Sequence, residues 1–489
     1  MQAVNGPRRK VHFIGVGGIG MSGLAEILLN LGYELSGSDV QHSSIVQRLE
    51  QFGLTFHRGH AAEHLGDAEI VVVSAAISED NAEIVAARQR GIPVLHRSEL
   101  LADLIPLKPH AVVVAGTHGK TTTTSMISAF LDSANIGATT IVGGILHRSG
   151  TNARWGAGDY LVAEADEHDG SFLKLHPTVA VVTSIDAEHL EYYGTLDRIK
   201  RAFVDFCNRV PFYGQSILCG DDLNCRDILP EIEGVTLTYG LNEDAALQGV
   251  NIRKGSVAEK KFGDGGMGPF RTLFDVISHD NRFGQEGFLG TVEIQAVGRH
   301  NIQNALAACS VGLCLGMRFA AVAAGLRQFD GVRRRLQWRG TAAGVQVIED
   351  YAHHPTEIAS TLEAARWLEP KRIVCVFQPH LYSRTKFFCE DFARILAQAD
   401  RALVTDIYPS REQPMPGVDA GLIVDAACAL GASHVELVRD MHAVPAEIAR
   451  FATAGDMVLV LGAGDVNCIA PAILESLEGV EKERGYGRT

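Results

Sequence analysis

A short glycine-rich segment, GTHGKT at residues 116–121, combines the residue types that hold a nucleotide phosphate. It follows the apolar run AVVVA and precedes a segment of helical period, which predicts a strand-to-helix turn. Unpaired backbone N–H groups and the helix dipole favour an anion at such a turn. Lys120 can then reach the β and γ phosphates, and Thr121 can offer its hydroxyl to Mg²⁺.

The spacing of this segment differs from that of the usual phosphate loop. Four residues normally separate the first glycine from the Gly-Lys pair, but here only Thr117 and His118 follow Gly116 before that pair. Four successive threonines from Thr121 are poor helix formers, yet they suit a first turn whose hydroxyls face an anion and its metal. A threonine-rich helix start with an unrelated lysine is the alternative interpretation.

A second glycine-rich turn, GVGGIG, satisfies Gly-x-Gly-x-x-Gly through Gly15, Gly17 and Gly20. It comes directly after an apolar run and opens a helical pattern. Asp39 ends the next apolar run, where an acidic residue would meet a ribose hydroxyl. This context predicts a dinucleotide or nucleotide-diphosphate site, and a turn that only lets helix and strand pack closely is the alternative. Taken alone, the turn would indicate an NAD-dependent dehydrogenase.

Acidic residues gather at the ends of two further apolar runs. They are Glu164, Asp166, Glu167 and Asp169 near the run 160–166, and Asp186, Glu188 and Glu191, with His189, near the run 179–186. Carboxylate oxygens suit Mg²⁺, which usually takes one or two of them and leaves its other positions to water and phosphate. We therefore expect one or two of these acids to be metal ligands, and the others to be solvated or to cap helices.

The chain divides into three blocks that alternate short Val/Ile-rich runs with longer segments of helical period. This rhythm is typical of βαβ units, so we predict an α/β protein of three domains, each built on a mainly parallel sheet with helices on its faces. The expected domains are residues 1–108, 109–326 and 327–489, and the prolines of LIPLKPH mark the first boundary. Parallel sheets bind ligands at the carboxyl ends of their strands, where the polar residues above are found.

Each block contains several short apolar runs that are typical of buried strands. They are residues 11–17, 33–39, 54–59, 70–76 and 93–97 in the first block, 111–116, 160–166 and 179–186 in the second, and 345–350, 373–377, 402–408 and 457–464 in the third. The glycine-rich stretch 254–290 lacks a clear period, and we predict hairpins at the edge of the second block there.

The composition excludes several classes of partner. The 489 residues carry a net charge of −14, which argues against a nucleic-acid or anionic-membrane surface but leaves a small phosphorylated ligand possible. The N-terminus has basic residues without the apolar core of a signal peptide, and no run approaches the ~20 apolar residues that span a bilayer. We predict a cytoplasmic protein whose nine scattered cysteines are reduced thiols.

The phosphate loop with its short spacing resembles the ATP loop of the Mur ligases, the ATP-dependent amide-forming enzymes of peptidoglycan precursor synthesis. The resemblance runs along nearly the whole chain and continues in GRHNIQNALAA, EDYAHHPTEI, FQPHLYSRT and DIYPSREQPMPGV. Together with GVGGIGMSGLAEIL, these phrases are most similar to the family members that join L-alanine to UDP-N-acetylmuramate. The resemblance implies a Rossmann-like first domain for UDP, a central P-loop domain for ATP and a Rossmann-like third domain for the amino acid.

The resemblance also implies a role for individual residues. The residues implied to bind the UDP-substrate are Gly17, Gly18, Ile19, Asp39, His60 and Ser74. The residues implied to bind ATP are Gly116, Thr117, His118, Gly119, Lys120, Thr121, Thr122, His300 and Asn304. The implied metal ligands are Thr121, Glu164 and His189, and the residues implied to bind the amino acid are Tyr351, His353 and Arg384. Lys120, His353 and Arg384 would be the catalytic residues. A helix residue without a ligand is the alternative for His300, and a simple strand-to-helix turn is the alternative for the YAHHP segment.

The implied reaction uses ATP and Mg²⁺, for which Mn²⁺ could substitute. Phosphorylation turns the carboxylate of UDP-N-acetylmuramate into an acyl phosphate, and the amine of L-alanine then attacks it. Lys120, Mg²⁺ and an arginine from 333–335 would neutralise the transferred charge, and His353 is the candidate base for the amine. We expect no nucleic-acid or membrane partner, a monomer or weak homodimer, and a hinge near residues 325–330 that closes the third domain to exclude water.

Some positions depart from the family pattern. The phrase TSIDAEH places Ser184, Asp186 and Glu188 where Asn, Glu and Asp are expected, although His189 is kept. Leu381 stands where some relatives carry an arginine, so an amino-acid-binding role there must fall on Arg384 or elsewhere. The carbamylated lysine of sister ligases is not assigned, because the matching region offers His189.

Three rival functions remain open at this point. A recycling ligase that attaches a whole peptide to UDP-muramate would use the same reaction with a larger donor pocket. A nucleotide-sugar oxidoreductase would use NAD on the first turn and give the phosphate loop no role. A non-catalytic nucleotide sensor would keep Lys120 but would not need the acids and the histidine around it.

Overall fold

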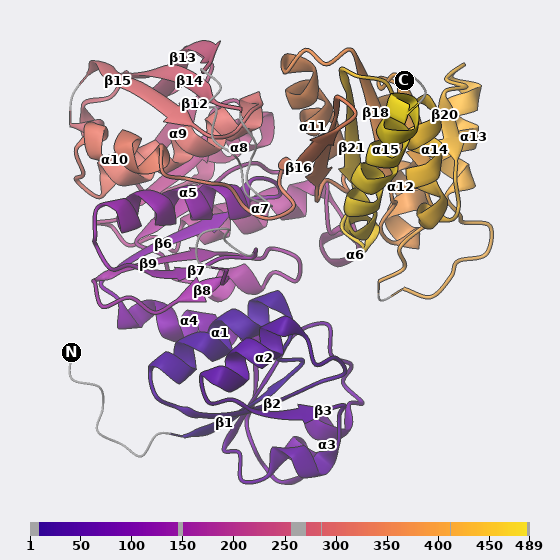
Figure 1. Cartoon of the computed structure of the whole chain (residues 1–489). Helices are drawn as coiled ribbons and strands as arrows, with labels where there is room; N and C mark the ends of the chain where they lie inside the picture. Colours follow the sequence, from indigo (N-terminus) through magenta and orange to yellow (C-terminus); the bar gives the residue numbers. More distant parts are fainter. Residues whose placement is uncertain (1–8, 145–149, 256–269, 285, 411, 487–489) are drawn as a thin grey trace. The chain divides into compact units, whose positions relative to one another are not determined.

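The computed structural model describes residues 9–144, 150–255, 270–284, 286–410 and 412–486 (Figure 1). Its strands form three sheets of five, ten and six strands. The first sheet and most strand pairs of the other two are parallel, and helices pack on the sheets. The predicted fold class, three α/β domains on mainly parallel sheets, is therefore confirmed.

The first sheet is fully parallel, with the order β3-β2-β1-β4-β5. Its elements are β1 (Lys10–Ile14), α1 (Ile19–Asn30), β2 (Glu34–Asp39), α2 (Ser44–Gln51), β3 (Thr55–Arg58), β4 (Ile70–Val73), α3 (Ala82–Gln89), β5 (Val94–His96) and α4 (Arg97–Leu104). The order reverses at β1, which lies between β2 and β4. A ligand is expected outside the carboxyl ends of these strands, at the turn after β1.

The second sheet has the order β15-β14-β13-β12-β11-β10-β6-β9-β7-β8. Its strands are β6 (His110–Ala115), β7 (Thr139–Ile141), β8 (Ala153–Arg154), β9 (Tyr160–Glu164), β10 (Val179–Val182), β11 (Gln215–Cys219), β12 (Thr236–Gly240), β13 (Leu247–Lys254), β14 (Thr272–Ser278) and β15 (Gly287–Ile294). The strand β6 lies between β10 and β9 and is parallel to both. The turn after β6 is therefore flanked by the ends of the two strands that precede the acidic residues.

The helices of this region are α5 (Lys120–Ser133), α6 (Leu190–Tyr193), α7 (Leu196–Cys207), α8 (Leu223–Ile228), α9 (Arg299–Cys314) and α10 (Phe319–Leu326). The stretch 254–290 was predicted to form hairpins at the edge of the second block, and the strands β14 and β15 do lie at one edge of the sheet, beside β13. Residues 256–269 of that stretch lie outside the described residues.

The third sheet has the order β16-β17-β21-β18-β19-β20, antiparallel only at β16–β17. Its elements are β16 (Gln337–Ala342), β17 (Val345–Asp350), α11 (Pro355–Trp367), β18 (Arg372–Phe377), α12 (Tyr382–Leu396), β19 (Arg401–Val404), α13 (Gly421–Ala429), β20 (Val435–Leu437), α14 (Val444–Phe451), β21 (Asp456–Leu461) and α15 (Ile469–Tyr486). Two apolar clusters, built from alternate residues of the central strands, cover its faces.

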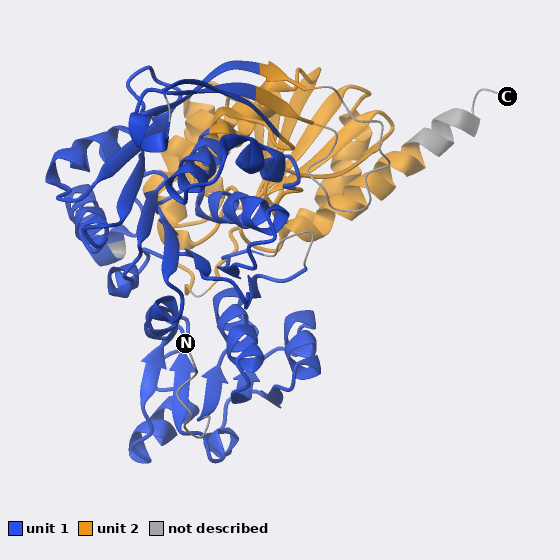
Figure 2. Ribbon diagram, turned by 90° about the vertical axis from the view of Figure 1, so that its left-hand side faces the viewer, with its two compact units in different colours: residues 1–252, 274–293, 303–329 blue, residues 253–273, 294–302, 330–489 orange. Residues whose placement is uncertain are grey.

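The chain forms two compact units (Figure 2). The first comprises residues 1–252, 274–293 and 303–329, and the second comprises residues 253–273, 294–302 and 330–489. The first unit thus contains the first sheet and most of the second.

Two further expectations concern the chain as a whole. All nine cysteines are free thiols, as predicted. Among the described residues, no helix combines the length and the apolar character needed to cross a bilayer.

The apolar face of α7 gives a test of the central core. Phe206 is fully buried, and its ring centroid lies 5.2 Å from that of Phe172. Replacing Phe206 with Ala is expected to lower the free energy of unfolding by about 3–5 kcal/mol, because it leaves a cavity in the core. Phe212, which is 95% exposed, is the matched control, and its replacement with Ala should change stability by less than about 0.5 kcal/mol. Urea unfolding followed by circular dichroism measures both, and equal effects would contradict the assigned core.

Candidate active site

The first glycine-rich turn holds a carboxylate against the start of α1. The helix begins after Gly18 as N-cap, and among the described residues no side chain caps it and no acid occupies its first turn. The N–H of Gly17 donates to Oδ2 of Asp39 over 2.9 Å, and a Cβ on Gly17 would lie at the same distance from that oxygen. The structure therefore brings Gly17, Gly18, Ile19 and Asp39 together where an anion is favoured.

His60 is half-buried and belongs to a hydrogen-bonded group around the buried carboxylate of Glu83. Its Nδ1 is 3.0 Å from Oε2 of Glu83 and 3.1 Å from Oγ of Ser38, the residue before Asp39. Burial alone would raise the pKa of Glu83, but hydrogen bonds from the surrounding histidines and Ser38 lower it to about 2. Ser74 directly follows β4, the neighbour of β1, at the same edge of the sheet.

The second glycine-rich turn is pinned to the end of β10. Gly116 has φ +127°, and a Cβ there would lie 2.2 Å from Oγ1 of Thr183. The N–H of Thr117 donates to the Ser184 carbonyl over 2.9 Å, and the N–H of His118 donates to the Ser184 hydroxyl over 3.0 Å. Only glycine fits at the first position of the turn.

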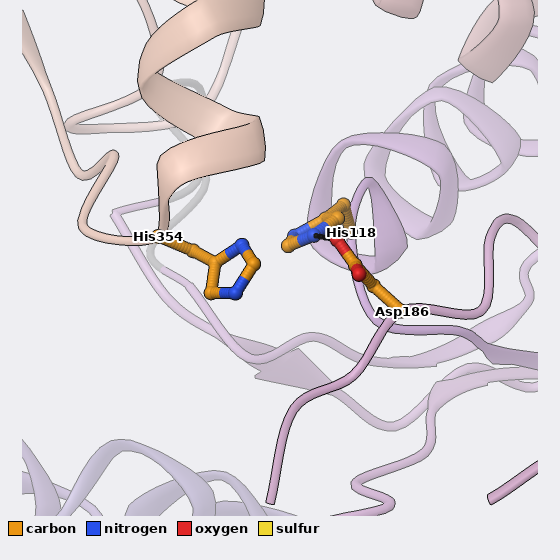
Figure 3. A group of neighbouring side chains, drawn as sticks. All are labelled: His118, Asp186 and His354. Carbon is orange, nitrogen blue, oxygen red and sulfur yellow. Dashed lines mark hydrogen bonds and ion pairs between the residues drawn. The ribbon is translucent and has the colours of Figure 1, made fainter. Parts of the chain in front are cut away.

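Two of the residues that depart from the family phrase take part in this pinning. Ser184 accepts the two bonds just described, and Asp186 donates its N–H to Oγ1 of Thr117 over 2.9 Å. The carboxylate of Asp186 also lies 3.2 Å from Nε2 of His118 (Figure 3). The hydroxyl and the carboxylate of the departing phrase therefore support the phosphate loop.

Lys120, the first residue of α5, has its ammonium enclosed by three acceptors. Nζ lies 2.5 Å from the carbonyl of Gly116 and 3.1 Å from that of Thr117. It also lies 2.9 Å from each carboxylate oxygen of Glu167. Burial alone would lower the pKa of Lys120, but three neighbouring carboxylates, that of Glu167 first, outweigh it and raise the pKa. The ammonium therefore stays charged at neutral pH.

Thr121 and Glu164, two of the three predicted metal ligands, are in contact. Oγ1 of Thr121 donates to Oε1 of Glu164 over 2.9 Å, and the N–H of Gly143 donates to Oε2 over 2.7 Å. His189, the third, has its Nδ1 3.0 Å from Nδ1 of His168, and burial lowers its pKa. A hydroxyl and a carboxylate are oxygen ligands of the kind that Mg²⁺ prefers, so the pair of Thr121 and Glu164 fits Mg²⁺ beside a nucleotide.

Asn304 lies against the phosphate loop. Oγ1 of Thr123 donates to Oδ1 of Asn304 over 3.2 Å, and a Cβ on Gly119 would lie 2.5 Å from the same oxygen. His300 lies one turn earlier on α9, where burial, and then the charge of Arg335, lower its pKa to about 4. Its ring is therefore neutral at pH 7. The predicted residues 116–122 form one continuous turn and helix start.

The predicted amino-acid residues gather around a histidine that the sequence analysis did not single out. The ring centroid of His380 lies 5.7 Å from that of His353, and its Nδ1 lies 3.1 Å from Nη1 of Arg384. The rings of Tyr351 and His353 are 5.3 Å apart. The structure therefore brings all three predicted residues into one cluster. The sequence could have indicated His380, because the phrase FQPH places this histidine just after the end of β18, where site residues are expected.

Two of the three arginines at 333–335 lie beside this cluster. The guanidinium carbons of Arg334 and Arg335 lie 4.8 and 5.3 Å from the centroid of the Tyr351 ring. Arg334 also donates to the carbonyls of Gly462 and Gly464 over 2.7 and 2.9 Å, so it holds the loop after β21. Arg335 pairs with Glu357, whose Oε1 lies 3.4 Å from its Nη1.

Ion pairs connect the first domain with the acidic end of β9, and no sequence pattern indicated them. Arg97, the first residue of α4, pairs with Asp166, and Glu99 accepts from Lys174 over 2.8 Å. The Arg97 guanidinium would also lie 3.0 Å from a Cβ on Gly20. Arg97 therefore touches the start of α1 and the acidic strand end together.

Three family models match successive parts of the chain. "Mur ligase family, catalytic domain" matches residues 10–108, "Mur ligase middle domain" matches 114–312, and "Mur ligase, glutamate ligase domain" matches 334–464. The chain belongs to the Mur ligase family. Membership implies that the protein uses ATP.

Relatives of this Mur ligase align along nearly its whole length. A UDP-N-acetylmuramate–L-alanine ligase of Geotalea daltonii is 45% identical over 472 residues, 96% of this chain and 99% of the relative. A ligase of the same name from Myxococcus xanthus is 45% identical over 468 residues, 96% and 95% of the two chains. The solved UDP-N-acetylmuramate-alanine ligase of Thermotoga maritima has 26% identity and a TM-score of 0.78, over 96% of this chain and all of that one.

The pinned turn gives a test of nucleotide binding. Changing Gly116 to Ala is expected to abolish binding of MgADP, because the new Cβ would collide with Thr183. Isothermal titration calorimetry measures the affinity. Gly91 has φ +71° and nothing within 4 Å of an added Cβ, so Gly91→Ala repeats the backbone strain without a collision and should leave the affinity unchanged. A folded Gly116→Ala variant with ordinary affinity would contradict the assigned loop.

Proposed function

We propose that this Mur ligase joins L-alanine to the carboxylate of UDP-N-acetylmuramate at the expense of ATP. One observation carries the proposal: the charged ammonium of Lys120 stands at the start of α5 in a chain that aligns end to end with ligases of that name. The proposed domains are residues 1–108 for the UDP-substrate, 109–326 for ATP and 327–489 for the amino acid.

The first step transfers the γ-phosphoryl group of ATP to the carboxylate and yields an acyl phosphate. Lys120 and the N–H groups of the turn 116–119 would hold the phosphates, and Arg335 would add positive charge. Thr121, Glu164 and His189 would hold Mg²⁺, which when bound offsets charge on the phosphate oxygens. These roles are supported by the contacts among Thr121, Glu164 and the loop.

The second step is attack of the alanine amine on the acyl phosphate, which expels phosphate. The amine must lose a proton, and His353 is the proposed acceptor. Nδ1 of His353 lies 2.9 Å from the Tyr351 carbonyl, which can only accept, so Nδ1 carries the proton and Nε2 is the basic nitrogen. Tyr351 and Arg384 are proposed to orient the amino acid and the reacting carboxylate.

A hinge near residues 325–330 would close the third domain and keep water from the acyl phosphate. The enzyme is proposed to act in the cytoplasm as a monomer or weak homodimer. On the first turn, Gly17, Gly18 and Ile19 would contact the UDP diphosphate, and the uridine end would meet the residues Asp39, His60 and Ser74.

The function can be tested by phosphate release. ATP, Mg²⁺ and UDP-N-acetylmuramate are supplied with each amino acid in turn, or with a free peptide whose amino terminus is unblocked, as the donor of a recycling ligase. L-alanine is expected to give the highest rate. Preferred use of the peptide would favour the recycling activity, and NAD(P)H turnover without phosphate release would favour an oxidoreductase.

The role of Lys120 predicts a large loss of rate. Lys120→Met is expected to lower kcat by at least about 10³-fold, since the transferred group loses its main protein charge. Lys200 lies on α7 and pairs with Asp227, so Lys200→Met removes the same charge away from the site and should retain activity. Undiminished alanine ligation by Lys120→Met would overturn the proposed function.

The role of His353 predicts a split between the two steps. His353→Ala is expected to slow amide formation about 10²-fold while acyl-phosphate formation continues. Trapping of the acyl phosphate by borohydride reduction and chromatographic assay of the amide product separate the steps. If both steps proceed at ordinary rates, His353 is not the base.

A further inference from the structure

Glu167 is the acceptor of the Lys120 ammonium that lies outside the phosphate loop. Its side chain is 4% exposed, and each of its carboxylate oxygens lies 2.9 Å from Nζ. The reaction described above gives this buried carboxylate no role. Removing a charge from water is costly unless an opposite charge is close, so each member of this ion pair offsets the cost of burying the other.

The ammonium has no hydrogen to spare for a nucleotide. An ammonium offers three N–H donors. Lys120 directs them at the carbonyls of Gly116 and Thr117 and at the carboxylate of Glu167. A phosphate oxygen can bind Nζ only if it replaces one of these three acceptors.

The two carbonyls are the harder acceptors to move. The turn that carries them is fixed by bonds from Thr117 to Ser184 and from Asp186 to Thr117. Gly116 packs against Thr183 with no room for even one added carbon. Withdrawal of either carbonyl would break several bonds at once.

Glu167 can leave by rotation of its side chain alone. Its backbone is anchored separately, because its carbonyl accepts the hydroxyl of Tyr193 over 2.6 Å and the N–H of Gly170 over 3.1 Å. The carboxylate can therefore swing away from Nζ while the chain around it stays in place. Of the three acceptors, only this one is attached through flexible side-chain bonds.

We propose that Glu167 is the resident counter-ion of Lys120, which keeps the ammonium aimed at the phosphate position and is replaced there by the phosphates of ATP. The inference rests on the proposed function only in taking ATP as the nucleotide. Glu167 is thus a positioning residue: it touches neither substrate nor reacting atom and acts through Lys120. Nucleotide binding at this turn is an exchange of one anion for another.

The surroundings of Glu167 favour the exchange. Burial raises the pKa of its carboxyl to about 7 against the opposing charge of Lys120, and the charge of Asp166 adds to the rise. The charged and titratable groups that face it are Lys120 on α5, Asp166 on its own loop and Tyr193 on α6. A carboxyl that has given up Lys120 to a phosphate can therefore be neutralised by a proton instead of remaining as a buried anion beside that phosphate.

The test is the affinity of variants for MgADP, whose β-phosphate reaches Lys120. Glu167→Gln keeps the shape but removes the competing charge, so it is expected to bind MgADP about tenfold more tightly than the wild type, as one charge-assisted hydrogen bond would imply. The KM for ATP should fall by more than kcat changes. Thermal unfolding should show a less stable nucleotide-free variant and a larger stabilisation by MgADP.

Two further variants keep the test decisive. Glu167→Met also lacks the charge and should show the same tightening if Glu167→Gln fails to fold. Asp159→Asn removes one negative charge at the opposite end of β9, and it should leave the affinity within about twofold of the wild type. Unchanged or weaker MgADP binding by the folded Glu167 variants would overturn the inference.

Failure of the proposed function would look different. Wild-type protein that binds MgADP but never releases phosphate with alanine would refute the alanine ligase. The exchange at Lys120 would still be judged by the binding data alone.

Discussion

The ammonium of Lys120 is the charge on which the arrangement of the central domain depends. It is buried at the first residue of a helix, where the helix dipole alone would repel it. Carbonyls of its own turn and the acids that follow β9 offset that cost. Because β6 lies between β10 and β9, one neighbouring strand fixes the turn and the other supplies the counter-charge. The strand order of the second sheet is therefore a requirement of the site.

The first domain contacts the central domain through its helix α1. The side chain of Asn152, next to β8, donates to the carbonyl of Ile19, and the hydroxyl of Thr151 donates to Glu26 on α1. Arg97 adds an ion pair with Asp166. These bonds join the start of α1 to the segment before β8 and to the acidic end of β9 within one compact unit.

The sequence sufficed to predict the parallel architecture, because short apolar runs are typical of buried strands. Two of the predicted runs extend past the observed strands: β1 ends at Ile14, before Gly15, and β4 ends at Val73, before Ser74. The short strands β7 and β8 carry too few residues for a pattern. Arg97 and the pairing of Glu167 were missed for a different reason: each gains its role from a contact with a distant segment, and no local spacing records such a contact.

Both glycine-rich turns place backbone N–H groups at the start of a helix, but they differ in the charged side chains beside them. At the first, the N–H of Gly17 already binds Asp39, and no lysine follows, so an anion there would be held by the helix start and the nearby Arg97. Such a site could bind a diphosphate, but no ammonium stands at the start of its helix. At the second, Lys120 stands at the helix start itself, and its mobile partner is a carboxylate that a phosphate can replace. The difference between holding a phosphate and transferring one therefore comes down to a single ammonium and to how readily its counter-ion leaves.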